Sequence, residues 1–152
     1  MNVEERLTLP ASRDAAWAFL WQVERVARCI PGCTDVQEVE PRQTYRAVFQ
    51  DSVGPYKVRF EVDIMLVDIQ EPSRIALRAS GRDTKLGARQ QVTLTLELNE
   101  LGPSQTELRV SGDVEILGKI ATLGQFVIKR KVKTVFEQFG QCVAREVANA
   151  GA

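Results

Sequence analysis

The residue types that usually carry out chemistry in proteins are sparse in this sequence, and histidine is missing altogether. Histidine is the usual general base near neutral pH and the commonest metal ligand. Its absence therefore argues against catalytic triads and most metal sites. What remains is chemistry by carboxylate or lysine side chains, or a site that binds a ligand without transforming it. We predict no metal site and no catalytic nucleophile.

The three cysteines are an odd number and do not stand at spacings typical of zinc or redox sites. Cys29 and Cys33 are separated by a proline and a glycine, so they cannot share a helical turn, and we expect neither a metal pair nor a disulfide between them. With Cys142, they are expected to be buried free thiols in a reducing compartment. The loop between the first two is either a tight structural turn or the mouth of a cavity, formed by Ile30, Pro31 and Gly32.

Four other polar side chains are candidates for hydrogen bonds to a ligand carbonyl or hydroxyl. Their positions in the alternating pattern could place them on or near the dry side of a sheet. They are Tyr45, Asp51, Tyr56 and Asp68. All four remain candidates from the sequence.

The composition sets the size and the class of the protein. A chain of 152 residues can bury one ordinary core. Its 20 Lys and Arg residues balance 20 Asp and Glu residues, so no overall charge attracts nucleic acid. Charged residues interrupt the first twenty positions, and no apolar run is long enough to span a bilayer. We expect a cytoplasmic protein with 1–152 as one domain.

The elements that must position a site begin with a strand over residues 3–9. Ser12 is a good N-cap for a helix that runs through Trp21, and a second short helix carries Val23 and Val26. From about residue 34 to 117 the pattern changes to a period of two, as in "YKVRFEVDIML", with short turns between segments. This pattern predicts an antiparallel meander of six or seven strands in total.

The last thirty residues predict one long amphipathic helix, from about 119 to 147. Apolar residues recur there at steps of three and four, from Ile128 to Val147. Such a helix can cover the dry face of the sheet. The predicted fold class is α+β, in which a curved antiparallel sheet of about seven strands wraps around a long C-terminal helix. Two short helices follow the first strand.

The inward residues of this fold are either core or the wall of an apolar pocket. On the strands they include Phe60, Val62, Leu77, Leu94, Leu96, Val110 and Val114. Gly118 and Gly124 flank an apolar segment, and they either form simple turns or allow the segment to act as a mobile gate. In the gate hypothesis the residues that face a ligand are Ile120, Leu123, Phe126 and Val127.

A basic cluster follows that segment and consists of Lys129, Arg130, Lys131 and Lys133. The simpler interpretation is a solvated helix face. The functional alternative is contact with anionic lipid headgroups or with a partner protein, since each basic residue near an anionic surface adds about 1 kcal/mol.

Several spaced segments closely resemble the CoxG family of carbon monoxide dehydrogenase accessory proteins, which belongs to the START-like helix-grip (SRPBCC) superfamily. They are "RCIPGC", "QDSVGPYKVRF", "SGRDTKLGA" and "GDVEILGKIATLGQFVIKRK". The resemblance implies a ligand cavity between the sheet and the long helix, which favours pocket wall over core near that helix. Some family members continue into a hydrophobic tail, whereas this chain ends at "VANAGA", so a permanent anchor is not expected.

The resemblance also implies a function. It is a non-catalytic accessory or carrier role beside a molybdenum-containing, carbon monoxide dehydrogenase-type hydroxylase, with a lipophilic ligand such as menaquinone, ubiquinone or another lipid and no other cofactor. It further implies recruitment to the inner face of the cell membrane. Two alternatives stay open: a cyclase or lyase acting inside the cavity, and a peripheral membrane adaptor whose cavity is incidental.

Overall fold

A computed structural model describes residues 1–150 of the chain, with side chains through residue 148. Seven strands and three α-helices follow the predicted order, and one short 3-10 helix is added. The elements are β1 (Asn2–Leu9), α1 (Arg13–Leu20), α2 (Val23–Arg28), β2 (Cys33–Glu40), β3 (Thr44–Val53), β4 (Tyr56–Gln70), β5 (Arg74–Asp83), β6 (Ala88–Gly102), β7 (Gln105–Leu117), η1 (Lys119–Leu123) and α3 (Gln125–Ala150).

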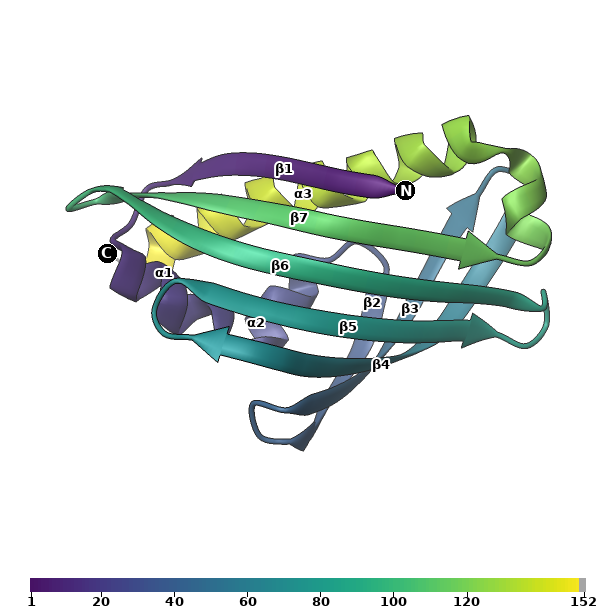
Figure 1. Cartoon of the computed structure of the whole chain (residues 1–152), viewed down its shortest axis with the longest axis horizontal. Coiled ribbons are helices and arrows are strands. Elements are labelled where there is room, and N and C mark those ends of the chain that lie inside the picture. The colour runs from purple at the N-terminus through teal and green to yellow at the C-terminus, as the bar shows by residue number, and fades with distance from the viewer. Residues whose placement is uncertain (151–152) are drawn as a thin grey trace.

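The strands form one antiparallel sheet in the order β1-β7-β6-β5-β4-β3-β2. The sheet curls, so that β2 and β3 turn away from the plane of the other strands, and α3 lies behind it along the β1 and β7 side (Figure 1). The antiparallel meander predicted from the period-two pattern is thus confirmed, and so is the helix-grip arrangement that the family resemblance implied.

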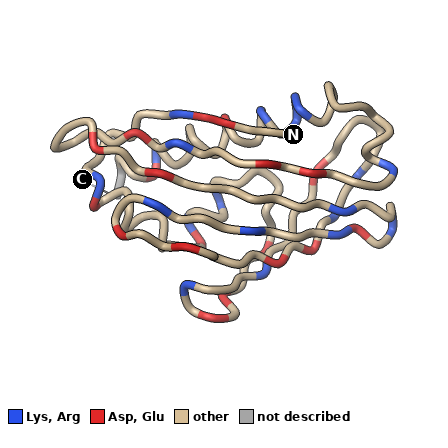
Figure 2. Tube along the Cα trace, in the orientation of Figure 1, with Lys and Arg blue, Asp and Glu red and all other residues tan. Residues whose placement is uncertain are grey.

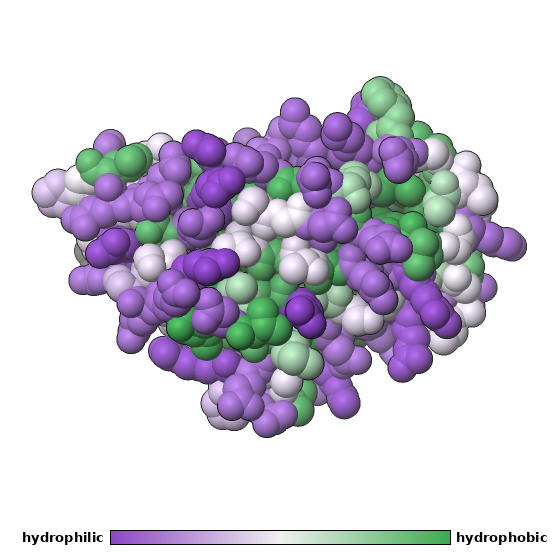
Figure 3. Space-filling view, viewed as in Figure 1, coloured by the Kyte–Doolittle hydropathy of each residue, from purple (hydrophilic) through white to green (hydrophobic). Residues whose placement is uncertain are grey.

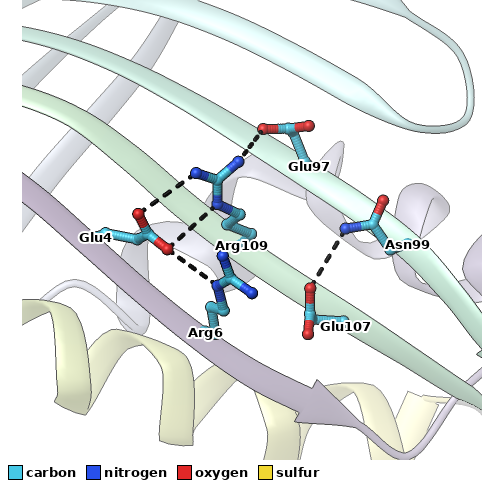
Figure 4. Close-up of polar contacts among 6 residues, drawn as sticks. All are labelled: Glu4, Arg6, Glu97, Asn99, Glu107 and Arg109. Atoms are coloured by element: carbon cyan, nitrogen blue, oxygen red, sulfur yellow. Dashed lines mark hydrogen bonds and ion pairs between the residues drawn. The ribbon is translucent and has the colours of Figure 1, made fainter.

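The two faces of the sheet differ because successive side chains alternate across it. Lys, Arg, Asp and Glu are interspersed along the strands (Figure 2). On the outer face Arg109 of β7 pairs with Glu4 of β1 at 3.3 Å and with Glu97 of β6 at 3.2 Å (Figure 4). The hydrogen bond from Arg109 is the main cause that lowers the pKa of Glu4. Because these charged residues occupy the outer face, the alternate residues of the same strands lie on the inner face, which is apolar.

The first helix begins where its cap predicts. The Ser12 hydroxyl accepts a hydrogen bond from the Ala15 N–H at 3.1 Å. Trp17 is buried, and its indole N–H donates to the Glu71 carboxylate at 2.8 Å. This bond connects α1 to the turn between β4 and β5 and closes one end of the sheet.

The C-terminal helix begins later than its hydrophobic period predicts. Gly118 and Gly124, with φ of 97° and 90°, cap a separate 3-10 helix, and α3 starts at Gln125. A side chain at Gly118 would collide with the Gly87 carbonyl, so this position requires glycine for conformation and for space. The prediction of one continuous helix from about 119 is therefore wrong, because Gly124 breaks the run.

Two hydrophobic clusters form the interior. The first gathers α1, the C-terminal half of α3 and the adjoining strand ends, with Phe19, Leu98 and Val143 among its most buried members. The second lies at the η1 end, with Phe60, Ile120 and Ile128. Gly140 lets α3 approach β1, since a Cβ there would lie 3.2 Å from a methyl group of Leu7.

The expectation of three free thiols is wrong for two of them. Cys29, at the end of α2, forms a disulfide with Cys142 of α3, and Cys33 is the free cysteine among the described residues. An ion pair of 2.6 Å between Arg25 and Glu146 links the same two helices. Rules based on the spacing of nearby cysteines do not predict this disulfide, because its two cysteines have a sequence separation of 113.

Candidate functional site

An apolar cavity of about 270 Å³ lies between the inner face of the sheet, η1 and the first half of α3. Its walls come from the loop after α2, from the start of β2, from β3 to β7, from Ile120 of η1 and from α3. They are Ile30, Cys33, Ala47, Phe49, Val53, Phe60, Val62, Ile64, Leu77, Ala79, Gln90, Val92, Leu94, Val114, Ile116, Ile120, Lys131, Val132, Val135 and Phe136. Apart from the thiol of Cys33, the polar side chains in this wall are Gln90 and Lys131.

Gln90 presents an unpaired polar group in this apolar wall. Its Oε1 atom is buried and has no hydrogen-bond partner. Gln90 pairs with Gly81 of β5 across the sheet, and a Cβ at Gly81 would lie 3.2 Å from that oxygen. The missing side chain at Gly81 therefore leaves room for the amide. A buried amide oxygen without a partner costs free energy, which a ligand with a hydrogen-bond donor would recover.

Lys131 lies between the cavity and solvent. Its Nζ atom is 2.6 Å from Oδ2 of Asp51 on β3, and about one third of its side chain is exposed. The pair bridges the space between α3 and β3, on the side of α3 away from β1. Lys131 is thus part of the cavity wall and is paired with Asp51, so the interpretation as a fully solvated residue is wrong for this position, while its contact with lipid headgroups stays a prediction.

Most of the strand residues predicted to face a ligand do line a cavity. Phe60, Val62, Leu77, Leu94 and Val114 surround the large one. Leu96 lines a smaller neighbouring cavity, whereas Val110 is buried in the first hydrophobic cluster and lines neither.

The apolar segment before α3 divides into inward and outward residues. Ile120 is 1% exposed and lines the cavity, while Leu123 packs against Gly54 in the second cluster. Phe126 is 73% exposed and Val127 37% exposed, and neither lines the cavity. Their predicted role as cavity wall is wrong, because the chain breaks at Gly124, where φ is 90°, and both residues belong to the first turn of a new helix, α3.

The remaining basic residues of the cluster face outward. Lys129 and Arg130 are exposed, and the Arg130 guanidinium lies 5.7 Å from the centre of the Phe126 ring. Lys133 is 4.0 Å from Glu137, one turn further along α3. Apolar side chains gather at the corner of the molecule where η1 meets α3 (Figure 3). This corner combines exposed apolar and basic groups.

The loop after α2 contributes one of its three predicted residues to the cavity. Ile30 lines it, whereas Pro31 and Gly32 do not. Gly32 has a φ of 86°, and a Cβ there would collide with the carbonyl oxygen of Gln50. The Gln50 N–H donates to the Gly32 carbonyl at 2.8 Å, so this loop is fixed to the end of β3.

The four polar candidates have different surroundings. Tyr45 is buried, its hydroxyl makes no hydrogen bond of good geometry, and burial followed by the Glu38 charge raises its pKa. Asp51 is engaged by Lys131, Tyr56 packs in the second cluster, and Asp68 pairs with Arg74 at 3.6 Å. Gln90 was not among the candidates. Its position in the sequence does indicate an inward side chain, because it stands two and four residues before the inward Val92 and Leu94 on the same strand.

The described residues contain no group of three or more His, Cys, Asp or Glu side chains placed to hold a metal ion. Their helices include none that is long and apolar enough to cross a membrane. The large cavity is an apolar space whose wall carries the polar side chains of Gln90 and Lys131 beside the thiol of Cys33.

Comparison with known proteins identifies the family of this chain. The family model for CoxG, a subunit of carbon monoxide dehydrogenase, matches residues 6–148. The chain belongs to the CoxG family. No curated protein matches the chain in sequence.

Solved structures place this CoxG-family chain in a wider fold group. A conserved protein from Geobacillus kaustophilus superimposes with a TM-score of 0.89 at 20% identity, covering 100% of this chain and 98% of that one. A START superfamily protein from Mycobacterium smegmatis gives 0.76 at 15%, with 97% of both chains covered. The Zhui aromatase/cyclase from a Streptomyces species gives 0.70 at 16%, covering 97% and 93%. At these identities the likeness shows the fold alone.

Proposed function

We propose that this CoxG-family protein is a non-catalytic carrier that binds a lipophilic quinone in the large cavity and serves a molybdenum-containing, carbon monoxide dehydrogenase-type enzyme. The observation that carries the proposal is the wall of the cavity, which is apolar except for Gln90, Lys131 and the thiol of Cys33. Ligand pockets are typically of this kind, with few polar groups that orient the ligand.

The Gln90 amide suits a ligand that changes its redox state. A glutamine side chain has both a donor and an acceptor end, so it can bond to a quinone carbonyl or to a quinol hydroxyl. Lys131 can donate in the same region when it turns from Asp51. The quinone and the quinol would thus both have a hydrogen-bond partner in the same site.

The same groups support a role without catalysis. Gln90 does not titrate, and Lys131 is paired with Asp51, so neither is a ready general acid or base. The alternative is an enzyme of the cyclase type, for which the structural likeness to the Zhui aromatase/cyclase is the precedent. In that case Tyr45 is the best candidate, since it is buried without a good hydrogen bond. Turnover that is lost in Tyr45→Phe would favour the enzyme over the carrier.

A second observation favours contact with an anionic membrane. Phe126 and Val127 are exposed beside Lys129 and Arg130. An aromatic group flanked by basic residues can enter the headgroup region while its neighbours pair with phosphates. Because the large cavity also begins at η1, this contact would bring the cavity close to the lipid from which a quinone is taken.

Binding can be tested with menadione, a naphthoquinone without a side chain, and with menaquinone. We expect purified protein to retain quinone detectable by mass spectrometry and to bind added quinone with quenching of its tryptophan fluorescence. Ala79→Phe, which fills the cavity, should abolish both signals. Ala76→Phe is the matched control, because it lies on the same strand but on the outer face.

Transfer to the enzyme needs its own assay. Quinone-loaded protein should supply quinone to a purified carbon monoxide dehydrogenase faster than free quinone does, and Ala79→Phe should not. Absence of quinone binding by the folded wild type would overturn the carrier proposal. Binding without any effect on the dehydrogenase would overturn the proposed partner alone.

A further inference from the structure

The outer face of the sheet carries a group of exposed basic side chains that form no ion pair with any described residue. Figure 2 shows Lys and Arg gathered at the end of the sheet where β5 turns into β6. We call this group the outer basic patch, and its members are Lys57 of β4, Arg78 and Arg82 of β5, Lys85 of the turn and Arg89 of β6. The neighbouring carboxylates on this face are Glu61 and Asp63, which already form ion pairs at 3.0 and 3.3 Å, and Glu115 of β7.

Two members of the patch repel each other. Arg82 and Arg89 are directly opposite in the register of β5 and β6. Residues in this relation have Cβ atoms about 4.5 to 5.5 Å apart, and like charges there are destabilising. Glu61 of β4 is opposite Arg82 on its other side, but its carboxylate pairs with Arg59 at 3.0 Å. An anion from outside the chain would relieve this repulsion.

The backbone beneath these cations is fixed. The buried carboxylate of Asp83 accepts hydrogen bonds from two backbone N–H groups of the β5–β6 turn, at 3.0 and 3.2 Å, and from one of β4, at 2.8 Å. A groove of about 460 Å³ lies between the turn and β4, and Lys57, Arg82 and Lys85 line it. Its two carboxylates, Asp83 and Glu61, are both engaged. The groove can therefore receive an anion without reordering its backbone.

The rest of the outer face favours a protein segment over a small anion. Arg78 precedes Arg82 by four residues on the same side of β5, which separates the two by about 13 Å at the usual rise of a strand. Arg78 also borders a second open groove, of about 590 Å³, in which Val39 and Met65 are 50% and 54% exposed. Arginine and methionine are enriched in protein interfaces. A single phosphate group would reach one end of this surface, whereas an extended segment would cover it.

We infer that the outer basic patch docks an extended, acidic segment of a partner protein. One carboxylate of the segment lies between Arg82 and Arg89, and another, four residues away, meets Arg78. The inference goes beyond the proposed function, because it needs neither the large cavity nor its ligand. A failure of either one therefore leaves the other standing.

The test uses two fluorescent peptides of identical composition, one with a glutamate at every fourth position and one with its glutamates adjacent. Fluorescence anisotropy at low salt should show tighter binding of the spaced peptide to the wild type, and added salt should weaken it. The double variant Arg82→Gln, Arg89→Gln should lose up to about fivefold in affinity for each arginine removed. Its thermal midpoint should not fall, because both side chains are exposed and their repulsion is removed.

The double variant Arg6→Gln, Arg74→Gln is the matched control. It removes two arginines of the outer face that already pair with Glu4 and Asp68, so it should bind the spaced peptide as the wild type does.

Arg78→Gln is a second test variant, and it should bind both peptides alike. A wild type that does not prefer the spaced peptide, or an equal loss of affinity in the control, would overturn the inference. Association with phosphatidylglycerol vesicles that disappears in Arg82→Gln, Arg89→Gln would also overturn it, because the occupant of the patch would then be a lipid surface.

Discussion

Lys131 of α3 and Asp51 of β3 form an ion pair of 2.6 Å at the border of the large cavity. Both side chains are partly exposed, and such pairs usually contribute about 0 to 1 kcal/mol to stability. The pair is therefore too weak to hold the fold together. Its position between α3 and β3 makes it a contact that must separate if the cavity opens on that side.

Asp51→Asn should speed ligand exchange without unfolding the protein. Loss of up to about 1 kcal/mol from the closed state corresponds to a dissociation rate up to about fivefold higher. Stopped-flow displacement of bound menadione measures this rate. Asp63→Asn is the matched control, since it breaks an ion pair with Arg46 on the outer face. A similar acceleration in both variants would contradict a specific role for Asp51.

Phe126→Glu should leave quinone binding intact and weaken vesicle association. The ring is 73% exposed and lies outside the cavity wall, so its replacement removes no ligand contact, while a new carboxylate opposes an anionic surface. Sedimentation with phosphatidylglycerol vesicles at low salt measures the effect. Leu101→Glu serves as control, because that exposed leucine lies in the β6–β7 hairpin at the other end of the sheet. Loss of quinone from Phe126→Glu would restore the gate hypothesis.

Cys142→Ser should lower the free energy of unfolding by about 2 to 4 kcal/mol in the oxidised protein, since the disulfide with Cys29 closes a long loop. Cys33→Ser should have a much smaller effect. Denaturant titration with and without dithiothreitol gives the comparison. Three alkylatable thiols in the protein unfolded without reductant would show that the disulfide does not form.

The protein should lose stability in acid when the carboxylate of Asp83 becomes protonated. Burial raises the pKa of its carboxyl group, but the backbone N–H groups of Arg59, Leu86 and Lys85 donate to it, and the net pKa is lowered. A lowered folded-state pKa stabilises the protein above the unfolded-state value of about 3.9, and this stability is lost as the pH falls through the folded-state pKa.

Asp83→Asn should therefore cost about 1 to 3 kcal/mol at neutral pH and little in strong acid. Denaturant midpoints from pH 7 down to about 3 would compare the variant with the wild type. A constant difference across the whole range would show that the carboxylate charge has no part in the effect.

Local patterns predicted most of the fold. Ser12 caps α1 through an atom three residues away, and the alternation in β4 follows from the geometry of a single strand. The start of α3 was harder, because residues 120–128 satisfy a helical period although Gly124 adopts a φ of 90°. A glycine within such a run indicates a position where the hydrophobic period no longer predicts a continuous helix.

The site was less predictable because it depends on partners distant in sequence. Nothing near Lys131 in the chain indicates Asp51, and nothing near Cys29 indicates Cys142. Gln90 is different, since its parity alone places it on the inner face. Membership in the CoxG family implied a cavity, but the residues that line it follow from the three-dimensional arrangement.

The two hydrophobic clusters give the protein an interior in two parts, and the large cavity has walls from both, with Phe60 and Ile120 from one and Leu94 and Phe136 from the other. In the absence of ligand, the η1 end can lose its amide protection while the α1 end keeps its own. A ligand that fills the large cavity, as we propose, would touch both parts and make them exchange as one unit. Amide exchange that becomes cooperative when ligand is added would then show that the ligand joins the two clusters into one core.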